Sequence, residues 1–388
     1  MTMGLSSPLA RVLTILAVVV AGLVAPAATA SAQANLSAQG FGYSPGQFSA
    51  RAQGTGGAVG ELDPMSPINP ATIAIFPGRI LFFQADPEFR TVTTANGTDH
   101  TSIARYPVVF GAMPVKGSLV VSLSSSTLLD RTSTTTFSTT QPLGGGDSVQ
   151  MFTTYHIDGA MNDVRLAGAW TPFSWLRVGL GAHAIAGHNL VDLQQSFPDS
   201  ERFATFTQSR ILGFSGSAAS AGFQIFNSQI DVSASARVGG SLHMSSEDTL
   251  LTSARVPNYF GASVAYMGIT GSTIAVRTAR EDWSSVGGLG TPGLIGVNAW
   301  DTSVGAELQG PKFGQRYVLL RGGFRTRTLP FQAANQTVTE KSFSGGIGTS
   351  FAQGHVLTDL GVIRATRSAD IAAQEHAWTI SVGVAVRP

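Results

Sequence analysis

A two-residue alternation of apolar and polar side chains is the feature that most constrains the fold of this 388-residue chain. It is clearest over residues 230–243, where even positions carry isoleucine, valine, alanine, glycine or leucine and odd positions carry mostly aspartate, serine, arginine or histidine. Successive side chains of a strand point to opposite faces, so the pattern predicts strands with one apolar and one polar face. The alternation returns over residues 300–308, 318–327 and 378–386. We therefore expect an all-β protein.

From residue 79 onward, about ten alternating residues are followed each time by a turn or a polar loop. A closed antiparallel barrel of the bacterial outer membrane requires an even number of such strands. The sequence predicts fourteen strands, over residues 79–92, 104–113, 118–128, 158–169, 175–187, 208–225, 229–243, 259–268, 273–281, 299–309, 316–327, 339–351, 355–367 and 376–386.

The connections between these strands alternate between short and long. Short turns are expected at 114–117, 170–174 and 352–354, and long loops at 130–157 and 282–298. Membrane barrels have short turns at one end and long loops at the other, with a belt of aromatic residues near each end. The predicted belts contain Trp170, Phe173, Trp175, Phe226, Phe313, Tyr317 and Phe351 beside the short turns, and Tyr259, Phe260, Trp283, Trp300 and Trp378 beside the long loops.

Composition agrees with a surface that avoids water. Charged residues make up only 12% of the chain, against about 25% in soluble proteins, and lysine occurs only three times. Residues 1–34 contain one basic and no acidic residue, so their removal leaves 23 basic and 23 acidic groups. A neutral chain lacks the positive charge that nucleic-acid binding requires. There is no cysteine, which excludes disulfides, thiolate nucleophiles and cysteine metal sites.

The first 34 residues have the layout of a secretory signal. Arg11 precedes the apolar run 12–24, which is followed by the small residues of 27–34. The run is shorter than the ~20 residues that a membrane helix needs. We expect residues 1–34 to be a signal peptide that is cleaved after Ala34.

A segment rich in glycine and proline follows, and it cannot form a core of its own. Residues 49–74 contain four glycines at 54–60 and three prolines at 64–70. The glycines permit tight turns and close backbone approach, and the prolines exclude regular helix or central strand. Its backbone polar groups need partners, which a surrounding wall can supply. We predict that residues 35–77 are a plug inside a barrel formed by residues 78–388.

With these features the chain resembles the FadL-type outer-membrane channels for hydrophobic compounds, a family that includes the toluene and xylene channels. One point of resemblance is the segment from Ser49-Ala50-Arg51 through Gly54-Thr55-Gly56-Gly57-Ala58 to Asn69-Pro70-Ala71, which is similar to the N-terminal plug of that family. Another is the hairpin formed by residues 162–166 and 175–181, which is similar to a periplasmic hairpin. The resemblance implies fourteen strands around a plug. It also implies plug and gating roles for Arg51, Gly54, Gly56, Gly57, Asn69, Pro70 and Ala71.

What the resemblance implies about function is passage of long-chain fatty acids or other apolar molecules across the outer membrane. Cargo would bind beside the plug, a plug movement would open the path, and a wall opening would release it sideways. Two features differ from the family. The chain ends in Val386-Arg387-Pro388 and not in an aromatic residue, and the third strand, 118–128, contains no glycine or proline that would kink it.

The polar face of the strands carries arginine, aspartate and glutamate. Arg237, Arg321, Arg325 and Arg327 are candidates for contact with a ligand carboxylate, which arginine can bind through two hydrogen bonds. The alternative is a lumen lined by paired charges that stiffens the barrel and holds the plug. We consider paired charges the better interpretation.

Other chemistries have little support in the sequence. The glycines at 54–60 lack the third glycine of a nucleotide-binding loop, and no G-x-S-x-G or H-E-x-x-H motif occurs. His183 and His243 fall on polar faces and could form a hydrolytic or metal site with a carboxylate, but isolated wall residues are the favoured interpretation. We expect no enzyme activity, no metal and no cofactor.

The sequence thus predicts an outer-membrane channel for passive uptake of hydrophobic small molecules, gated by its plug. Its expected partners are a hydrophobic ligand, outer-membrane lipid and lipopolysaccharide, and the barrel-assembly machinery. An alternative is a plugged barrel that handles or anchors secreted proteins, and a lumen or loop enzyme ranks third.

Overall fold

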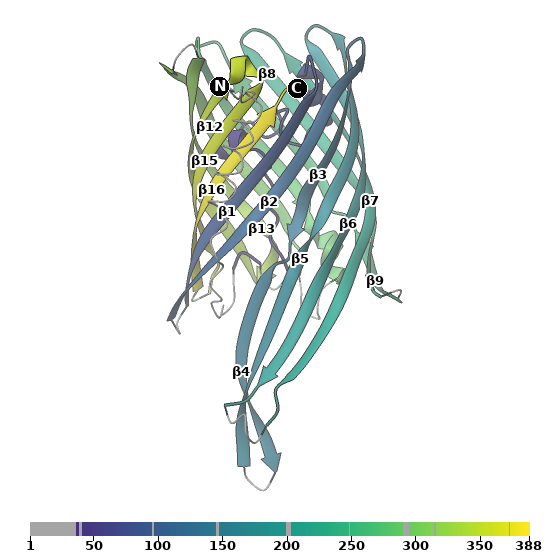
Figure 1. The fold of residues 1–388 in the computed structure, drawn as a ribbon, viewed down its shortest axis with the longest axis vertical. Helices are drawn as coiled ribbons and strands as arrows, with labels where there is room; N and C mark the ends of the chain where they lie inside the picture. Colours follow the sequence, from purple (N-terminus) through teal and green to yellow (C-terminus); the bar gives the residue numbers. More distant parts are fainter. Residues whose placement is uncertain are drawn as a thin grey trace, which may run out of the picture.

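The computed structural model describes residues 36–38, 41–94, 97–144, 147–198, 203–247, 249–289, 295–313, 316–371 and 373–388. The predicted signal peptide lies outside these residues. Sixteen strand segments form one antiparallel sheet, which closes on itself because β10 pairs with β8 (Figure 1). The segments are β1 (Ile80–Thr94), β2 (Gly97–Lys116), β3 (Leu119–Asp130), β4 (Ser133–Gly144), β5 (Asp147–Phe173), β6 (Leu176–Ser196), β7 (Phe206–Phe226), β8 (Ile230–Ser246), β9 (Thr249–Arg255), β10 (Asn258–Tyr266), β11 (Ser272–Asp282), β12 (Asn298–Phe313), β13 (Arg316–Ala333), β14 (Gln336–Phe351), β15 (Val356–Ser368) and β16 (Ala373–Val386).

These sixteen segments make a fourteen-stranded barrel, as the sequence predicts. β3 and β4 pair in succession with the same strand, β5, and β9 and β10 pair in succession with β8. Each of these two pairs occupies the place of one barrel strand. Every predicted strand overlaps one strand of the barrel.

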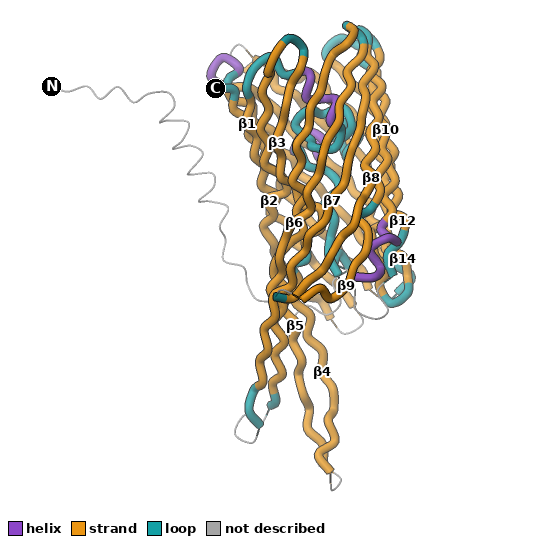
Figure 2. The backbone as a smooth tube through the Cα atoms, turned by 90° about the vertical axis from the view of Figure 1, so that its right-hand side faces the viewer, coloured by secondary structure: helices purple, strands orange, loops and turns teal. Residues whose placement is uncertain are grey.

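The expectation of a long loop over residues 130–157 is wrong. β4 and the first part of β5 form a hairpin there, and together with β6 and β7 it extends beyond one end of the barrel (Figures 1 and 2). The Thr- and Ser-rich sequence of β4 suits a strand because threonine is β-branched. Outside the barrel wall neither face meets lipid, so the two-residue alternation that marks the other strands is lost.

The alternation over residues 230–243 also fails in its last third. Arg237 lies inward and Val238 outward, as expected, but the β7–β8 register shifts between Gly216 and Ala218. A register shift of this kind exchanges the faces of the residues beyond it. Leu242 is therefore buried inside, whereas His243 is exposed and contacts the Ser253 hydroxyl (2.9 Å).

The outer face of the barrel is apolar. Many large apolar side chains on it are exposed, including Leu81, Leu166, Leu180, Val276, Val304, Phe343 and Val362. Trp170, Phe173, Trp175, Tyr317 and Phe351 are exposed near the tight turns, and Phe260, Trp300 and Trp378 near the other end. Tyr259 and Trp283 do not belong to the predicted outer belt: Trp283 is fully buried, and the Tyr259 hydroxyl points inward to Glu61.

The two ends of the barrel differ. At one end, the tight-turn end, consecutive strands are joined by the turns near residues 117, 174, 228 and 353. At the other, the hairpin end, β4 to β7 project (Figure 1). In the described residues, no helix has both the length and the apolar character that crossing a membrane requires.

Candidate functional site: the plug and the lumen wall

The N-terminal segment from residue 41 to residue 76, here called the plug, lies inside the barrel towards the tight-turn end (Figure 2). Its helix α2 (Ala50–Gly54) begins at Ser49, whose hydroxyl accepts a hydrogen bond from the Ala52 amide (3.0 Å). Beyond the helix, Gly56 and Gly57 have φ angles of +67° and +93°, which side-chain-bearing residues avoid. The first wall strand, β1, begins at Ile80, two residues after the predicted start of the barrel.

The turn after α2 packs directly on the backbone of the wall. A Cβ atom at Gly305 of β12 would lie 2.1 Å from the Thr55 carbonyl oxygen, and one at Gly323 of β13 would lie 2.2 Å from the Thr55 carbonyl carbon. A Cβ atom at Gly56 would meet the Phe324 backbone nitrogen at 2.7 Å. Real Cβ atoms do not come this close, so only glycine fits on either side of the contact.

The other predicted plug glycines have distinct neighbours. A Cβ atom at Gly54 would lie 3.4 Å from the Gly346 Cα, and the Ser344 hydroxyl donates to the Gly54 carbonyl oxygen (3.1 Å). Gly57 lies beside the Gln47 side chain, where a Cβ atom would have contacts of 3.3 Å. Gly54 thus contacts the wall, and Gly57 shapes the plug itself.

The predicted Asn69-Pro70-Ala71 motif both starts a helical turn and ties the plug to the wall. The Asn69 carbonyl oxygen Oδ1 accepts from the Ala71 amide (2.9 Å), and Pro70 opens the 3₁₀ helix η1 (Pro70–Ile75). Asn69 Nδ2 donates to the Ser233 hydroxyl of β8 (2.6 Å) and to the Glu61 carbonyl (3.1 Å). One side chain therefore caps η1 and joins two parts of the plug to the wall.

Arg51 is the cation of the plug. Its Nε and Nη2 atoms donate to the two carboxylate oxygens of Glu307 on β12, both at 3.1 Å, and Asp63 of the plug lies 3.7 Å from Nη1. Burial alone would lower the pKa of Arg51, but Glu307 and Asp63 raise it above its ordinary value. The paired geometry fixes α2 at one height in the lumen.

Glu61 is the buried anion of the plug. It accepts hydrogen bonds from the Ser235 hydroxyl (2.6 Å) and the Tyr259 hydroxyl, and Arg277 lies 3.6 Å away. Burial raises the pKa of Glu61, and Arg277 and the two hydroxyls oppose that shift. Arg51 and Glu61 therefore attach the plug to different parts of the wall, β12 and β8–β11.

All four arginines predicted to contact a ligand are paired with wall carboxylates. The pairs are Arg237 with Glu281 (2.5 Å), Arg321 with Glu307 (2.6 Å), Arg325 with Asp301 (2.7 Å) and Arg327 with Glu340 (2.6 Å). Arg327 also donates to the Ser44 carbonyl of the plug (2.8 Å). This is the geometry of the alternative interpretation, in which lumen charges pair and hold the plug. A role in ligand contact stays a prediction, and it would require each arginine to exchange a carboxylate for the ligand.

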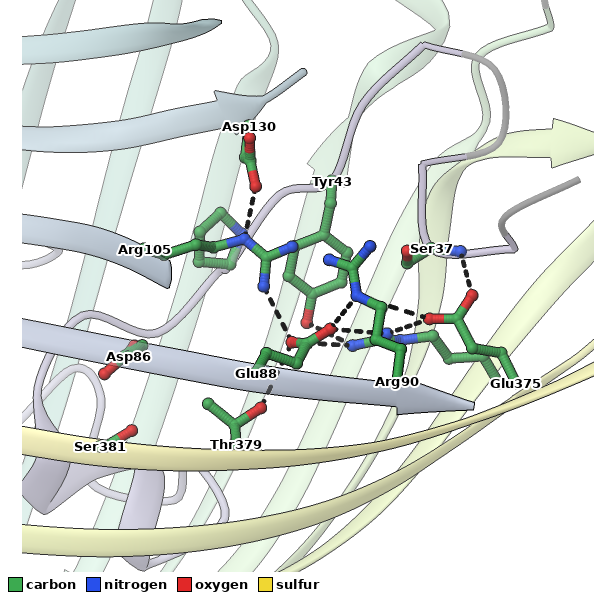
Figure 3. A network of polar contacts seen from close by, with 12 residues as sticks. Ser37, Tyr43, Asp86, Glu88, Arg90, Arg105, Asp130, Glu375, Thr379 and Ser381 are labelled. Carbon is green, nitrogen blue, oxygen red and sulfur yellow. Dashed lines mark hydrogen bonds and ion pairs between the residues drawn. The ribbon is translucent and has the colours of Figure 1, made fainter. Parts of the chain in front are cut away.

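A second group of paired charges surrounds Tyr43 of the plug (Figure 3). Arg367 contacts Glu375 (2.5 Å) and Glu88 (3.1 Å), and Arg105 contacts the other Glu88 oxygen (2.8 Å). The guanidinium groups of Arg105 and Arg367 lie 4.6 and 4.7 Å from the centroid of the Tyr43 ring. Two wall arginines thus make cation–π contacts with one aromatic ring of the plug. Glutamates of β1 and β16 hold these arginines in place through ion pairs.

Two apolar clusters enclose this polar layer. The first, at the hairpin end, contains Phe41, Leu128, Leu129, Met161, Ile185, Phe214, Leu242, Val256, Trp283, Val286, Leu289 and Phe331. The second, at the tight-turn end, contains Met65, Ile73, Phe76, Ile80, Phe82, Val108, Phe110, Ala112, Val120, Ala167, Ala169 and Ala385. A molecule passing along the lumen would meet apolar side chains first, then the polar layer with the plug, and then apolar side chains again.

A cavity of about 50 Å³ lies between the plug and strands β3, β5 to β8, β10 and β11. Its apolar lining comes from Phe48, Pro67 and Ile68 of the plug and from Leu128 and Ala236 of the wall. Leu128 also belongs to the apolar cluster at the hairpin end. The cavity therefore borders both the plug and the apolar cluster at the hairpin end.

The wall glycines that receive the plug were not predicted. Besides Gly305 and Gly323, a Cβ atom at Gly179 would lie 2.5 Å from the Ala71 amide nitrogen, one at Gly222 would lie 2.0 Å from Asn69 Oδ1, and one at Gly261 would lie 2.2 Å from Glu61 Oε1. Glycine on an inward strand position is the only sequence signal for such a contact. It does not say which part of the plug would lie there.

No protein-family model and no curated protein matches the sequence. Solved structures do match the fold. A crystal structure of a Pseudomonas aeruginosa FadL homologue has a TM-score of 0.61 and 11% identity, over 89% of this chain and 99% of that chain. The Ralstonia pickettii toluene transporter TbuX has a TM-score of 0.55 and 13% identity, over 88% and 98%. The monoaromatic hydrocarbon channel CymD has a TM-score of 0.54 and 12% identity, also over 88% and 98%. The resemblance to FadL-type channels is thereby confirmed at the level of the fold.

Proposed function

We propose that this chain is a FadL-type channel of the bacterial outer membrane that takes up hydrophobic small molecules, with the plug as its gate. The observation that carries the proposal is the order of the buried side chains along the lumen, in which a layer of paired charges lies between two apolar clusters and the plug contributes to all three. Solved structures with the same fold include a toluene transporter and a monoaromatic hydrocarbon channel. Its cargo would be long-chain fatty acids or aromatic hydrocarbons. Uptake of this kind is passive and needs no catalytic group.

A sideways exit is supported by a gap in the hydrogen-bond ladder. β2 pairs with β3 only from Val108 opposite Ser126 to Lys116 opposite Leu119. Among the described residues, the stretch of β2 from Gly97 to Pro107 has ladder partners on β1 alone, since β4 pairs with β5. Residues 131–132, where the chain leaves the wall between β3 and β4, include no glycine and no proline. We infer that cargo leaves through this gap, beside residues 97–107 of β2 and beyond the stretch where β2 pairs with β3.

A disulfide lock tests the gate. A Cβ atom at Gly383 of β16 would lie 3.4 Å from the Ala50 Cβ of α2, close to the spacing of a disulfide. The natural chain has no cysteine, so Ala50→Cys with Gly383→Cys introduces a single possible bond. The oxidised protein should lose uptake of a radiolabelled fatty acid or toluene into cells, and reduction should restore it. Each single variant is the control.

Two outcomes would contradict different parts of the proposal. Unchanged uptake with the disulfide formed would show that the plug does not gate. Equal uptake by cells with and without the protein would show that it is not a channel for these compounds.

The projecting hairpins favour a second candidate function, the handling of secreted proteins. β4 to β7 extend beyond the barrel (Figure 2), and exposed polar residues there accompany exposed apolar ones such as Phe152 and Leu190. A barrel of that kind would co-purify with a secreted partner through these hairpins, and shortening β4 and β5 together would abolish the association while leaving hydrocarbon uptake unchanged.

The proposed location brings further partners. The apolar outer face would contact outer-membrane lipid and lipopolysaccharide, and the barrel-assembly machinery would insert the chain.

A further inference from the structure

Three side chains on neighbouring strands form a hydrogen-bonded series in the lumen. Ser220 lies on β7, His183 on β6 and Asp163 on β5. The Ser220 hydroxyl is 2.8 Å from His183 Nε2, and His183 Nδ1 is 2.8 and 2.9 Å from the two Asp163 oxygens. His183 is therefore not the isolated wall residue that the sequence suggests.

The hydrogen bonds determine the direction of the series when the imidazole is neutral. A carboxylate can only accept, so His183 Nδ1 carries the proton and donates it to Asp163. His183 Nε2 is then the acceptor, and Ser220 must donate its hydroxyl proton to it. This is the arrangement in which a histidine acts as general base for a serine nucleophile. Arg237 Nη1, 3.4 Å from Asp163, helps to keep the carboxylate charged.

The series borders the cavity described above, which Ser220, His183 and Asp163 help to line. Phe48, Ile68 and Leu128 give this cavity its apolar surface. A substrate would therefore combine a reactive polar group with an apolar body.

An unpaired buried cation lies beside Ser220. Arg165 is 1% exposed, and its Nε and Nη2 atoms have no hydrogen-bond partner among the described residues; Nη1 donates to the Ile68 carbonyl (3.3 Å). A Cβ atom at Gly181 would lie 2.6 Å from the Ser220 Oγ and 3.2 Å from the Arg165 Cδ, so the two side chains meet over this glycine. Strand amides are engaged in the ladder, so Arg165, whose side chain lies next to Ser220 without lining the cavity, is a donor that can turn to an oxyanion here.

We propose that Ser220 is a nucleophile that hydrolyses carboxylic esters with an apolar acyl group. The Ser220 Oγ forms a bond to the ester carbonyl carbon while its proton moves to His183 Nε2, and Arg165 stabilises the oxyanion. The bond from that carbon to the alcohol oxygen then breaks, and the alcohol leaves with the proton from His183. Water attacks the acyl-serine, its proton passes to His183 and then to the Ser220 oxygen, and the free carboxylic acid is released. This activity does not depend on transport.

Covalent labelling tests the nucleophile. The full chain in detergent is treated with diisopropyl fluorophosphate, and the modified peptide is identified by mass spectrometry. We expect one phosphoryl adduct per chain, on Ser220, and hydrolysis of p-nitrophenyl butyrate that the reagent abolishes. Ser220→Ala should lose both. Ser118→Ala, at an exposed serine in a tight turn, should keep both. An unlabelled wild-type protein, or equal labelling of Ser220→Ala, overturns the proposal.

Two further variants separate catalysis from wall structure. His183→Gln should slow labelling by about 10²–10⁴-fold, the usual contribution of a general base. Gly181→Ala should slow labelling by displacing Ser220 and Arg165, whereas Gly168→Ala, where nothing lies within 4 Å of the added Cβ, should not. Heat-modifiable migration in gels identifies variants that keep the folded barrel. A folded His183→Gln protein that is labelled at the wild-type rate would contradict the role of His183.

Discussion

At the scale of single residues, the contact between plug and wall depends on the absence of side chains. Thr55 and Gly56 rest on Gly305 and Gly323, and the Asn69-Pro70-Ala71 motif rests on Gly179 and Gly222. In contacts of this kind the two backbones approach closely, and no side chain of the glycine packs between them. The glycine contacts set the position of the plug by shape, and the polar contacts of Arg51, Glu61 and Asn69 add to its attachment.

Gly323→Ala should displace the plug. The added Cβ would meet three backbone atoms of Thr55 and Gly56 at 2.2–2.4 Å, and backbone cannot move aside as a flexible side chain can. Overpacking of this kind costs about 1–3 kcal/mol. We expect faster sugar entry in liposome-swelling assays. Gly322→Ala is the matched control, because its nearest neighbour would be 3.9 Å away. Equal swelling of the two variants would contradict the packing argument.

Arg367→Met should destabilise the whole barrel. Arg367 is 1% exposed and pairs with Glu88, Glu340 and Glu375, so its loss leaves three buried carboxylates short of a cation. Breaking one buried pair typically costs 3–5 kcal/mol of unfolding free energy, and a loss of about that size is expected in urea titrations in detergent. Arg364→Met, at an exposed residue of the same strand, should change it by less than about 1 kcal/mol.

At the scale of elements, the wall is continuous except where strands leave it. β3 and β4 divide one strand position between them, and so do β9 and β10. The division after β3 allows the hairpin to project, and among the described residues it leaves one edge of β2, over residues 97–107, without a partner strand. The same structural feature therefore creates both an external surface and the proposed exit.

Hydrogen exchange in detergent should show this edge. Among the described residues, the amides of β2 between Gly97 and Arg105 that point away from β1 lack a ladder acceptor, whereas residues Val108 to Ala112 pair with both β1 and β3. The first set should exchange within minutes, since opening costs little where no ladder bond is broken. The second set should stay protected for hours. Uniform protection along β2 would mean that the wall is closed there.

At the scale of the whole molecule, the layered lumen and the apolar exterior are both consistent with the proposed channel. In the proposed channel the outside faces lipid, and the two apolar clusters of the lumen, with the layer of paired charges between them, suit hydrophobic cargo. The hairpins of such a channel would lie outside the cell and its tight turns in the periplasm.

Cysteine labelling on intact cells tests that direction. The chain has no cysteine, so Thr139→Cys on β4 and Ser118→Cys in a tight turn each provide one reactive group, and both positions are exposed. A membrane-impermeant maleimide should label Thr139→Cys in intact cells and Ser118→Cys only after the outer membrane is broken. If only Ser118→Cys were labelled in intact cells, the barrel would have the opposite orientation in the membrane.

The sequence by itself determined the class of fold, because a period of two along a strand is a local property that each residue carries. The alternation around Arg237 and Val238 places the correct side chains inside and outside, and the count of strands follows from its repetition. It fails at Leu242, where a register shift with the preceding strand exchanges the faces, and in β4, where no lipid selects an apolar face. Only the tertiary structure decided which groups meet in the lumen. Glu307 is 256 residues from Arg51 and meets it because the plug lies inside the barrel. Ser220 is 37 residues from His183 and meets it because of the register in which β6 and β7 pair.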